Sequence, residues 1–251
     1  MLKSGLVSVT FRKLQPKEIV DLVAKAGLAG IEWGGDIHVP HGDAARAREA
    51  AKMTAEAGLK VAAYGSYYIV GRDESPSFQA VLDSASELGA PLIRVWAGEK
   101  SPADADAADR KKVVDDSIRI ADLAAARRLT VAFEFHGGTL TETDDSAVRL
   151  LAEIGRPDVR SYWQPRVQDT VPDQLRGLDA VLPWLANVHC FHWEAGTYAR
   201  LPLEQGESNW KQYLDRIRQA AGDRYVMIEF VKDDSPDAFL RDAAALRKWL
   251  A

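Results

Sequence analysis

Cysteine is nearly absent from this chain, since Cys190 is the only one among 251 residues. A single thiol excludes an internal disulfide framework and is typical of a reducing compartment. The segment Met1–Phe11 is too short and too mixed in polarity for a signal peptide, and no apolar run approaches the length of a membrane span. These absences predict a cytoplasmic protein that does not contact membranes.

An excess of positive charge is also missing, because 32 Lys and Arg residues face 37 Asp and Glu residues, for a net charge of −5. Binding to nucleic acid regardless of its sequence depends on neutralising phosphates, so we expect no nucleic-acid partner. The chain also contains no GxGxxG motif, no P-loop motif and no GxSxG elbow. Dinucleotide binding, P-loop phosphate binding and hydrolysis at a serine elbow therefore lack their sequence signals.

What the chain does have is a regular alternation of apolar runs and helical patterns. The predicted strands are Gly5–Phe11, Ala29–Trp33, Lys60–Tyr64, Pro91–Trp96, Thr130–Phe135, Val159–Trp163, Asn187–Trp193 and Tyr225–Val231. The predicted helices are Pro16–Ala26, Asp43–Ala57, Phe78–Leu88, Asp104–Arg128, Asp144–Ile154, Pro172–Leu185, Asn209–Ala221 and Pro236–Leu250. The spacing of roughly thirty residues matches one βα repeat for each pair.

This alternation predicts a single (β/α)₈ TIM barrel of the α/β class. Strict alternation favours a parallel sheet, and near-continuous apolar strands are typical of a sheet that is covered on both faces. The length suits a barrel, which typically needs about 250 residues. A doubly wound open sheet is the alternative. Because no linker or low-complexity segment divides the chain, residues 1–251 are predicted to form one domain.

Two glutamates interrupt apolar strands, Glu134 in VAFEFH and Glu229 in VMIEFV. Burying an unpaired carboxylate is costly, so each needs a partner. One such residue is explained by an arginine or by backbone donors. Two at corresponding ends of different strands favour a shared cation or a shared substrate, because the carboxyl ends of barrel strands form the active site.

Two further polar residues lie at the ends of other predicted strands, His189 and Gln164. Together with Glu134 and Glu229 they form a mixed oxygen and nitrogen ligand set. Such a set suits one divalent cation, which we expect to be Mn²⁺, Mg²⁺ or Co²⁺, with Zn²⁺ as a further option. His192 is the alternative to His189, because strand alternation directs the two rings to opposite faces and at most one points inward.

Aromatic residues gather near the same strand ends, and they have two interpretations. They form flat walls for sugar rings, or they are packing at the barrel rim, where large amphipathic rings are common. These aromatic residues are Trp33, Tyr64, Tyr67, Tyr68, Trp96, Trp163 and Trp193.

Several segments resemble the xylose isomerase-like superfamily, specifically its sugar phosphate isomerase/epimerase group. These segments are GIEWGGDIHVPHGD at 30–43, SYYIVG at 66–71, IRVWAG at 93–98, FEFHGGTLTET at 133–143, YWQP at 162–165, VHCFHW at 188–193, RLPLEQG at 200–206 and IEF at 228–230. The resemblance implies a TIM barrel that holds one divalent cation with Glu, Asp, His and Glu from its last four strands. Glu134, His189 and Glu229 match this pattern. Gln164 stands where the Asp is expected, and its amide oxygen adds no charge.

The resemblance also implies a small-molecule carbohydrate substrate. Arg200 is similar to a substrate-facing arginine of the family, and His136 to its substrate-contacting polar group. The full set of candidate substrate-binding residues is Glu32, His38, Tyr67, Trp96, His136, His192 and Arg200. A homo-oligomer is compatible with the sequence.

The implied chemistry is proton transfer next to a carbonyl through an enediolate, with Glu134 and Glu229 as the catalytic pair. The main interpretation is therefore a metal-dependent isomerase or epimerase of a sugar, a sugar phosphate or a polyol ketone. A second interpretation is a metal-dependent dehydratase or lyase that acts on an inosose-like or glycoside-like ketone, because it begins with the same proton abstraction.

Two less favoured interpretations belong to different classes of protein. A non-catalytic sugar-binding barrel is favoured by Gln164, because this residue replaces an acidic ligand. A DNA-repair endonuclease relative normally needs a three-metal cluster with many His and Asp ligands. The chain has five His residues, an acidic balance and no Asp-x-x-His after its sixth strand, and all three features disfavour an endonuclease.

Overall fold

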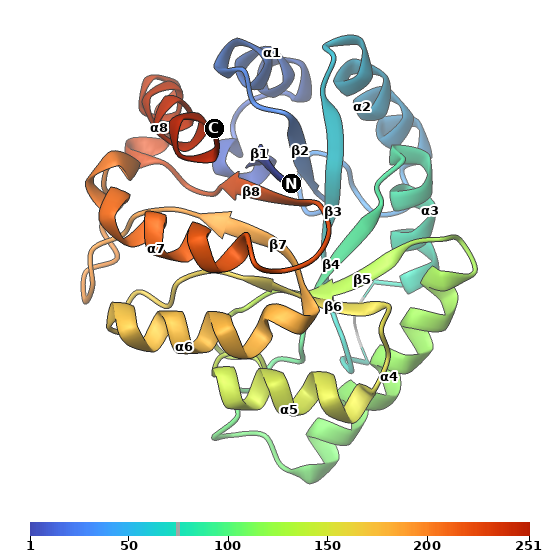
Figure 1. The fold of residues 1–251 in the computed structure, drawn as a ribbon. Helices are drawn as coiled ribbons and strands as arrows, with labels where there is room; N and C mark the ends of the chain where they lie inside the picture. Colours follow the sequence, from blue (N-terminus) through green and yellow to red (C-terminus); the bar gives the residue numbers. More distant parts are fainter. Residues whose placement is uncertain (74–75) are drawn as a thin grey trace.

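The strands of this chain pair in sequence order, and the last returns to the first to close the sheet (Figure 1). The structure is a computed structural model that describes residues 1–73 and 76–251. The strands are β1 (Leu2–Val7), β2 (Gly30–Gly34), β3 (Lys60–Ile69), β4 (Leu92–Trp96), β5 (Thr130–Phe133), β6 (Val159–Trp163), β7 (Leu185–Cys190) and β8 (Arg224–Ile228). Because neighbouring strands are parallel all the way round, the predicted (β/α)₈ TIM barrel is confirmed and the open sheet is wrong.

In the described residues, eight α-helices form a ring outside the strands (Figure 1). They are α1 (Pro16–Ala26), α2 (Ala44–Glu56), α3 (Phe78–Leu88), α4 (Ala107–Ala125), α5 (Asp144–Ile154), α6 (Val171–Val181), α7 (Glu207–Ile217) and α8 (Pro236–Leu250). Short 3₁₀ helices are η1 (Ser8–Phe11), η2 (Leu182–Trp184), η3 (Leu203–Gly206) and η4 (Lys232–Asp234). Among the described residues, no helix is long and apolar enough to cross a membrane.

Helix α1 illustrates how the sequence sets these elements. The Gln15 N–H donates to the Glu18 carboxylate at 2.7 Å, which satisfies one of the free donors at the helix start. Ile19 and Val23, one helical turn apart, are fully buried against the barrel. The helix ends at Gly27, whose φ of 66° is a left-handed conformation that glycine adopts without strain.

Two predicted elements differ from the structure for physical reasons. The predicted strand Gly5–Phe11 ends early, at Val7, and continues as η1, because the chain turns across the top of the barrel. There the Ser8 hydroxyl accepts the Gly34 N–H at 2.9 Å, and the Thr10 hydroxyl accepts the Phe230 N–H at 3.0 Å. The other element is the helix predicted to run from Pro172 to Leu185.

That helix, α6, ends at Val181, and Pro183 lies in η2. Proline has no N–H to continue an α-helix. Strand β7 therefore begins at Leu185, and it ends at Cys190 rather than at Trp193. The remaining predicted elements overlap the observed ones, with ends displaced by a few residues.

One buried carboxylate, Asp242 on α8, is not part of the barrel interior. It is 5% exposed, and it accepts the Leu203 N–H at 2.9 Å, so it fastens η3 to α8. Burial raises the pKa of Asp242 to about 6. Asp242 therefore binds its proton more tightly in the folded chain than in the unfolded chain.

We expect the free energy of unfolding to fall as the pH rises through the folded pKa of Asp242. The stabilisation is complete below about pH 4 and lost above about pH 6, and it amounts to roughly 3 kcal/mol. The Asp242→Asn variant keeps an oxygen acceptor for Leu203 but does not titrate, so this pH dependence should flatten. Urea unfolding of both proteins across this pH range measures it, and parallel curves would show that Asp242 contributes nothing.

Candidate active site and metal centre

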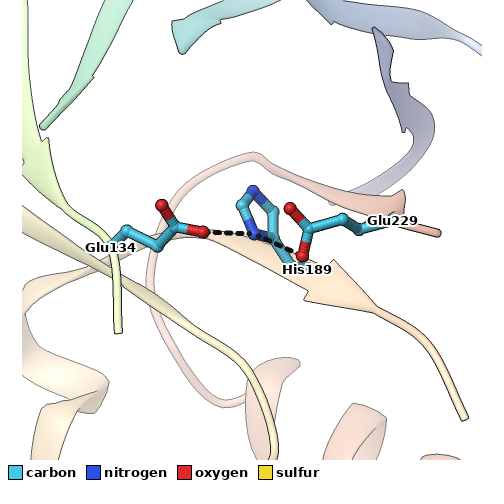
Figure 2. A group of neighbouring side chains, drawn as sticks. All are labelled: Glu134, His189 and Glu229. Carbon is cyan, nitrogen blue, oxygen red and sulfur yellow. Dashed lines mark ion pairs between the residues drawn. The ribbon is translucent and has the colours of Figure 1, made fainter. Parts of the chain in front are cut away.

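Three side chains from the last four strands converge at the carboxyl ends of the barrel strands (Figure 2). Glu134 follows β5, His189 lies in β7 and Glu229 follows β8. Figure 2 shows the two carboxylates reaching toward the His189 ring from opposite sides. His189 Nδ1 lies 3.4 Å from Glu134 Oε1 and 3.3 Å from Glu229 Oε2. One ligand atom of each residue lies within 4.8 Å of the others, so this group, the Glu–His–Glu triad, can hold a metal ion.

Gln164, at the end of β6, joins the triad through its amide oxygen. Gln164 Oε1 lies 3.0 Å from His189 Nδ1, the same nitrogen that faces both carboxylates. Three oxygens from three residues therefore surround one imidazole nitrogen. This donor set matches the mixed ligands that divalent cations such as Mn²⁺ or Zn²⁺ accept.

The charge at the site also fits a cation. The buried carboxylates are those of Glu32, Glu134 and Glu229, and the buried guanidinium beside them is that of Arg94. The three carboxylates therefore outnumber the one guanidinium, and negative charge remains beside His189. Burial by itself would lower the pKa of His189, but the carboxylates of Glu229, Glu134 and Glu32 outweigh burial and raise that pKa well above its usual range. The triad thus attracts positive charge strongly, as a metal centre must.

Arg94 holds the triad from below. Its Nε donates to Glu32 Oε1 at 2.6 Å, and its Nη1 donates to Glu134 Oε2. Trp96 Nε1 donates to the same Glu134 oxygen at 2.6 Å. Burial would raise the pKa of Glu134, but the Arg94 charge outweighs burial and holds that pKa below its usual range. Glu134 therefore stays ionised, with Oε2 fixed and Oε1 directed at His189.

Glu32 lies deeper in the barrel, and both of its oxygens are engaged. Oε1 accepts from Arg94, while Oε2 accepts the Tyr162 hydroxyl at 2.7 Å. Glu32, Arg94 and Tyr162 belong to β2, β4 and β6, so they resemble one of the interior layers that alternate strands contribute in this fold. The Tyr162 ring also meets the His189 ring edge-on, with centroids 5.0 Å apart. This layer fixes the orientation of the imidazole above it.

A bulge in β3 completes the support. The register between β3 and β4 shifts between Gly65 and Tyr68. A Cβ on Gly65 would lie 2.7 Å from Arg94 Nη2, so only glycine leaves room for the buried guanidinium. Tyr67 takes a left-handed φ of 55°, and Arg94 Cζ lies 5.0 Å from the centre of its ring. Such strain in a non-glycine residue is common at functional sites.

Above the triad lies a cavity of about 770 Å³. Its aromatic walls consist of Tyr67, Trp96, Phe135, Phe191, Trp193, Tyr198 and Phe230. His136 stacks on Trp96, with ring centroids 4.4 Å apart, and its Nδ1 lies 2.7 Å from the Gly137 carbonyl oxygen. A carbonyl only accepts, so Nδ1 carries the hydrogen and the other ring nitrogen, Nε2, is left as a proton acceptor.

The structure brings only part of the predicted substrate-binding set to this cavity. Tyr67, Trp96 and His136 line it together with Glu134, Gln164 and Glu229. Glu32 is fully buried beneath it. His38 is also buried, with Nδ1 2.9 Å from the Ser8 hydroxyl. Of the aromatic residues expected near the strand ends, Trp33, Tyr64 and Trp163 are buried in the hydrophobic core and do not line the cavity.

The two other predicted contacts lie to the side. His192 is half-buried and borders a second cavity of about 200 Å³ beside Trp210. Arg200 pairs with Asp234, and its Cζ lies 4.6 Å from the centre of the Phe230 ring. Arg200 therefore lies against Phe230, a residue of the cavity wall, and is not among the residues that line the cavity.

Sequence reasoning assigns no role to Arg94 or Tyr162. Arg94 carries the same signal as the two glutamates, a charge inside an apolar strand (LIRVW). A buried arginine and two buried glutamates in one barrel are expected to form ion pairs with one another. Tyr162 has no comparable signal, because tyrosine is common in strands.

The comparisons with known proteins agree with this fold. The family described as xylose isomerase-like TIM barrel matches residues 20–249, so the chain belongs to that family. A 3-dehydroshikimate dehydratase from Bacillus anthracis is 23% identical over 163 residues, which are 58% of each chain. The chain therefore matches less than two thirds of that relative.

Solved structures share the fold over nearly the whole chain. A probable 3-DHS dehydratase from Bacillus anthracis, described as involved in petrobactin synthesis, has a TM-score of 0.81 at 19% identity, and the match covers 98% of each chain. A D-allulose 3-epimerase from Methylomonas sp. has a TM-score of 0.73 at 14% identity over 98% of this chain and 97% of that one. At these identities the likeness establishes the fold alone.

We expect Arg94→Met to lower the free energy of unfolding by about 3–5 kcal/mol, because Glu32 and Glu134 would remain buried without a counter-charge. Arg127→Met is the matched control, since Arg127 pairs with Asp83 at the surface and such pairs contribute about 1 kcal/mol or less. Urea unfolding measures both variants. A loss in Arg94→Met no larger than in the control would contradict the supporting role of Arg94.

We expect Gln164→Asp to tighten binding of Mn²⁺ by about tenfold or more, because a carboxylate replaces a neutral ligand at the triad. Gln168→Asp is the control, since Gln168 also lines the cavity but is exposed, and the same charge there should change the affinity little. Titration calorimetry with Mn²⁺ measures both. An unchanged affinity in Gln164→Asp would remove Gln164 from the ligand set.

Proposed function

We propose that this protein is a metal-dependent dehydratase that eliminates water from a small cyclic hydroxyketone such as 3-dehydroshikimate. The observation that carries the proposal is the pairing of two features in one cavity. A cation-holding triad forms its floor, and His136 presents a free nitrogen from its wall. The dehydratase named among the relatives supports elimination over isomerisation.

The proposed ligands of the cation are Glu134, Gln164, His189 and Glu229. When bound there, a divalent cation supplies Lewis acidity that stabilises negative charge developing on a ketone oxygen. Glu134 is poorly suited to proton transfer, because Arg94 and Trp96 hold its charged form. We therefore assign the carboxylates mainly to holding the cation, in contrast to the acid–base pair expected from the sequence.

His136 is the proposed general base. Its Nδ1–H donates to the Gly137 carbonyl and stacking on Trp96 holds the ring, so Nε2 keeps one direction. Nε2 removes the proton from the carbon next to the ketone. The hydroxyl on the following carbon then leaves, and it takes up the proton that His136 holds, so that water forms and His136 is regenerated. One C–H and one C–O bond break, one C=C bond forms, and no oxidant is needed.

With 3-dehydroshikimate, this elimination followed by tautomerisation gives 3,4-dihydroxybenzoate and one water. The hydroxyl that leaves is on the carbon next to the one that loses its proton, so one positioned base is enough. The aromatic walls suit both the ring of the substrate and the flat product. These features support a six-membered ring as the substrate.

An isomerase or epimerase remains the second candidate, because the epimerase structure shares the fold and the reaction begins with the same proton removal. Epimerisation needs proton transfer on both faces of one carbon, and in the pair expected from the sequence Glu134 and Glu229 would each exchange a proton. The low pKa of Glu134 disfavours that role. For an endonuclease, the described part of the chain offers one group of three metal-ligating residues, where a three-metal cluster needs many more.

We expect purified protein with Mn²⁺ to convert 3-dehydroshikimate to 3,4-dihydroxybenzoate. His136→Asn should lower kcat about 100-fold or more while cation affinity stays near that of the unchanged protein, because Asn can still donate to Gly137 but cannot accept the proton at Nε2. Glu229→Gln should lower both kcat and cation affinity. Product absorbance and titration calorimetry measure these changes.

Two outcomes would contradict the proposal. One is near-full turnover by His136→Asn. The other is turnover of D-allulose with no turnover of 3-dehydroshikimate when the two substrates are offered side by side, a result that would favour the epimerase.

A further inference from the structure

Two arginines line the cavity above the triad, Arg12 and Arg166. Arg166 is held by its own loop, because its Nε donates to Asp169 at 2.7 Å, its Nη1 to the Glu142 carbonyl at 2.9 Å and its Nη2 to Asp144 at 3.1 Å. Two carboxylates therefore already neutralise its charge. Arg166 is thus a structural cation that fastens the loop after β6.

Arg12 is different, because its guanidinium has donors to spare. It follows η1 at the mouth of the cavity, and its side chain is 46% exposed. Nη1 pairs with Asp36 at 2.5 Å, and Nη2 donates to the Tyr67 hydroxyl at 3.4 Å. A guanidinium has five N–H groups. Within the described part of the chain, three of those in Arg12 have no hydrogen-bond acceptor.

Tyr67 holds Arg12 at the cavity. The Arg12 Cζ lies 6.0 Å from the centre of the Tyr67 ring, and the Arg94 Cζ lies 5.0 Å from the same centre. The Tyr67 ring thus lies near both the buried arginine that holds the triad and the exposed arginine at the mouth. A substrate that lies against Tyr67 and reaches the triad therefore also comes near Arg12.

We propose that Arg12 binds a carboxylate of the substrate, and this inference rests on the proposed function. Glu134, Glu142 and Glu229 also line the cavity, so an anionic substrate meets carboxylates there. An anionic substrate needs a cation there to offset this repulsion. A planar guanidinium with free N–H groups matches a carboxylate through two parallel hydrogen bonds.

The arrangement selects a carboxylate over a phosphate. Asp36 already offsets the single charge of Arg12, and Arg166 is held by its own carboxylates, so the free N–H groups of Arg12 are the donors that the mouth offers. A phosphate group carries about two negative charges at neutral pH and needs several donors. The substrate class is therefore a cyclic hydroxyketone with one carboxylate, rather than the sugar phosphate included in the sequence-based expectation.

Asp36 acts as a competitor for Arg12 in this arrangement. Removing the Asp36 charge frees the guanidinium, while removing the Arg12 charge abolishes the binding group. The two variants should therefore change carboxylate binding in opposite directions. If the ion pair between Arg12 and Asp36 were purely structural, both variants would weaken carboxylate binding, because either substitution breaks the same contact.

The test compares Arg12→Gln, Asp36→Asn and the control Lys13→Gln, which makes the same charge change at the neighbouring exposed residue outside the cavity. We expect Arg12→Gln to raise KM for 3-dehydroshikimate about 30-fold with kcat changed less than about threefold. Asp36→Asn should lower that KM. Neither variant should change KM for an inosose, which has a similar ring without the carboxylate.

Binding of 3,4-dihydroxybenzoate and of catechol, followed by tryptophan fluorescence, separates this inference from the proposed function. If 3-dehydroshikimate is not dehydrated but Arg12→Gln weakens only 3,4-dihydroxybenzoate binding, the proposed function fails and the Arg12 assignment stands. Equal effects of Arg12→Gln and Lys13→Gln would overturn the assignment. Weaker binding of 3,4-dihydroxybenzoate in Asp36→Asn would overturn it as well.

Discussion

The buried charge network around Arg94 is the constraint on which the rest of the site depends. One guanidinium from β4 meets Glu32 from β2 and Glu134 after β5, in a position where an unpaired charge would be costly. Gly65 makes room for this group, and Tyr67 covers it from a strained backbone. Because Arg94 and Trp96 together hold one oxygen of Glu134, the other oxygen faces His189. The barrel interior thus builds a rigid base for a cluster that attracts cations.

The net charge of this network connects it to the proposed function. The network leaves negative charge uncompensated beside an imidazole whose pKa the same carboxylates raise. A cation and a proton therefore compete for this cluster, and that competition is typical of metal sites with histidine and carboxylate ligands. The loops add two groups to which we assign roles in an elimination, His136 as the proposed base on one wall and Arg12 at the mouth. The barrel fold is common to the family, while His136 and Arg12 define the proposed reaction.

Much of the fold can be predicted from the sequence, because apolar runs in strict alternation with helices leave few arrangements other than a closed parallel sheet. Glu134, His189 and Glu229 stand out for a related reason, since polar residues inside apolar strands need partners. The orientation of other residues depends on features without a local signal. The β3 bulge turns Tyr67 into the cavity, the early end of β1 leaves His38 buried, and Asp234 draws Arg200 aside. Such partners lie far apart in sequence and meet only through register and loop geometry.

We propose above all that the protein, with a divalent cation held at the triad, removes water from a cyclic hydroxyketone. The most direct test of this proposal is mass spectrometry of 3-dehydroshikimate incubated with chelator-treated protein, before and after Mn²⁺ is restored. We predict a product lighter than the substrate by one water, formed only after Mn²⁺ is restored. A product of unchanged mass would identify an isomerase or epimerase instead, and water loss at full rate with chelator present would contradict the role of the metal.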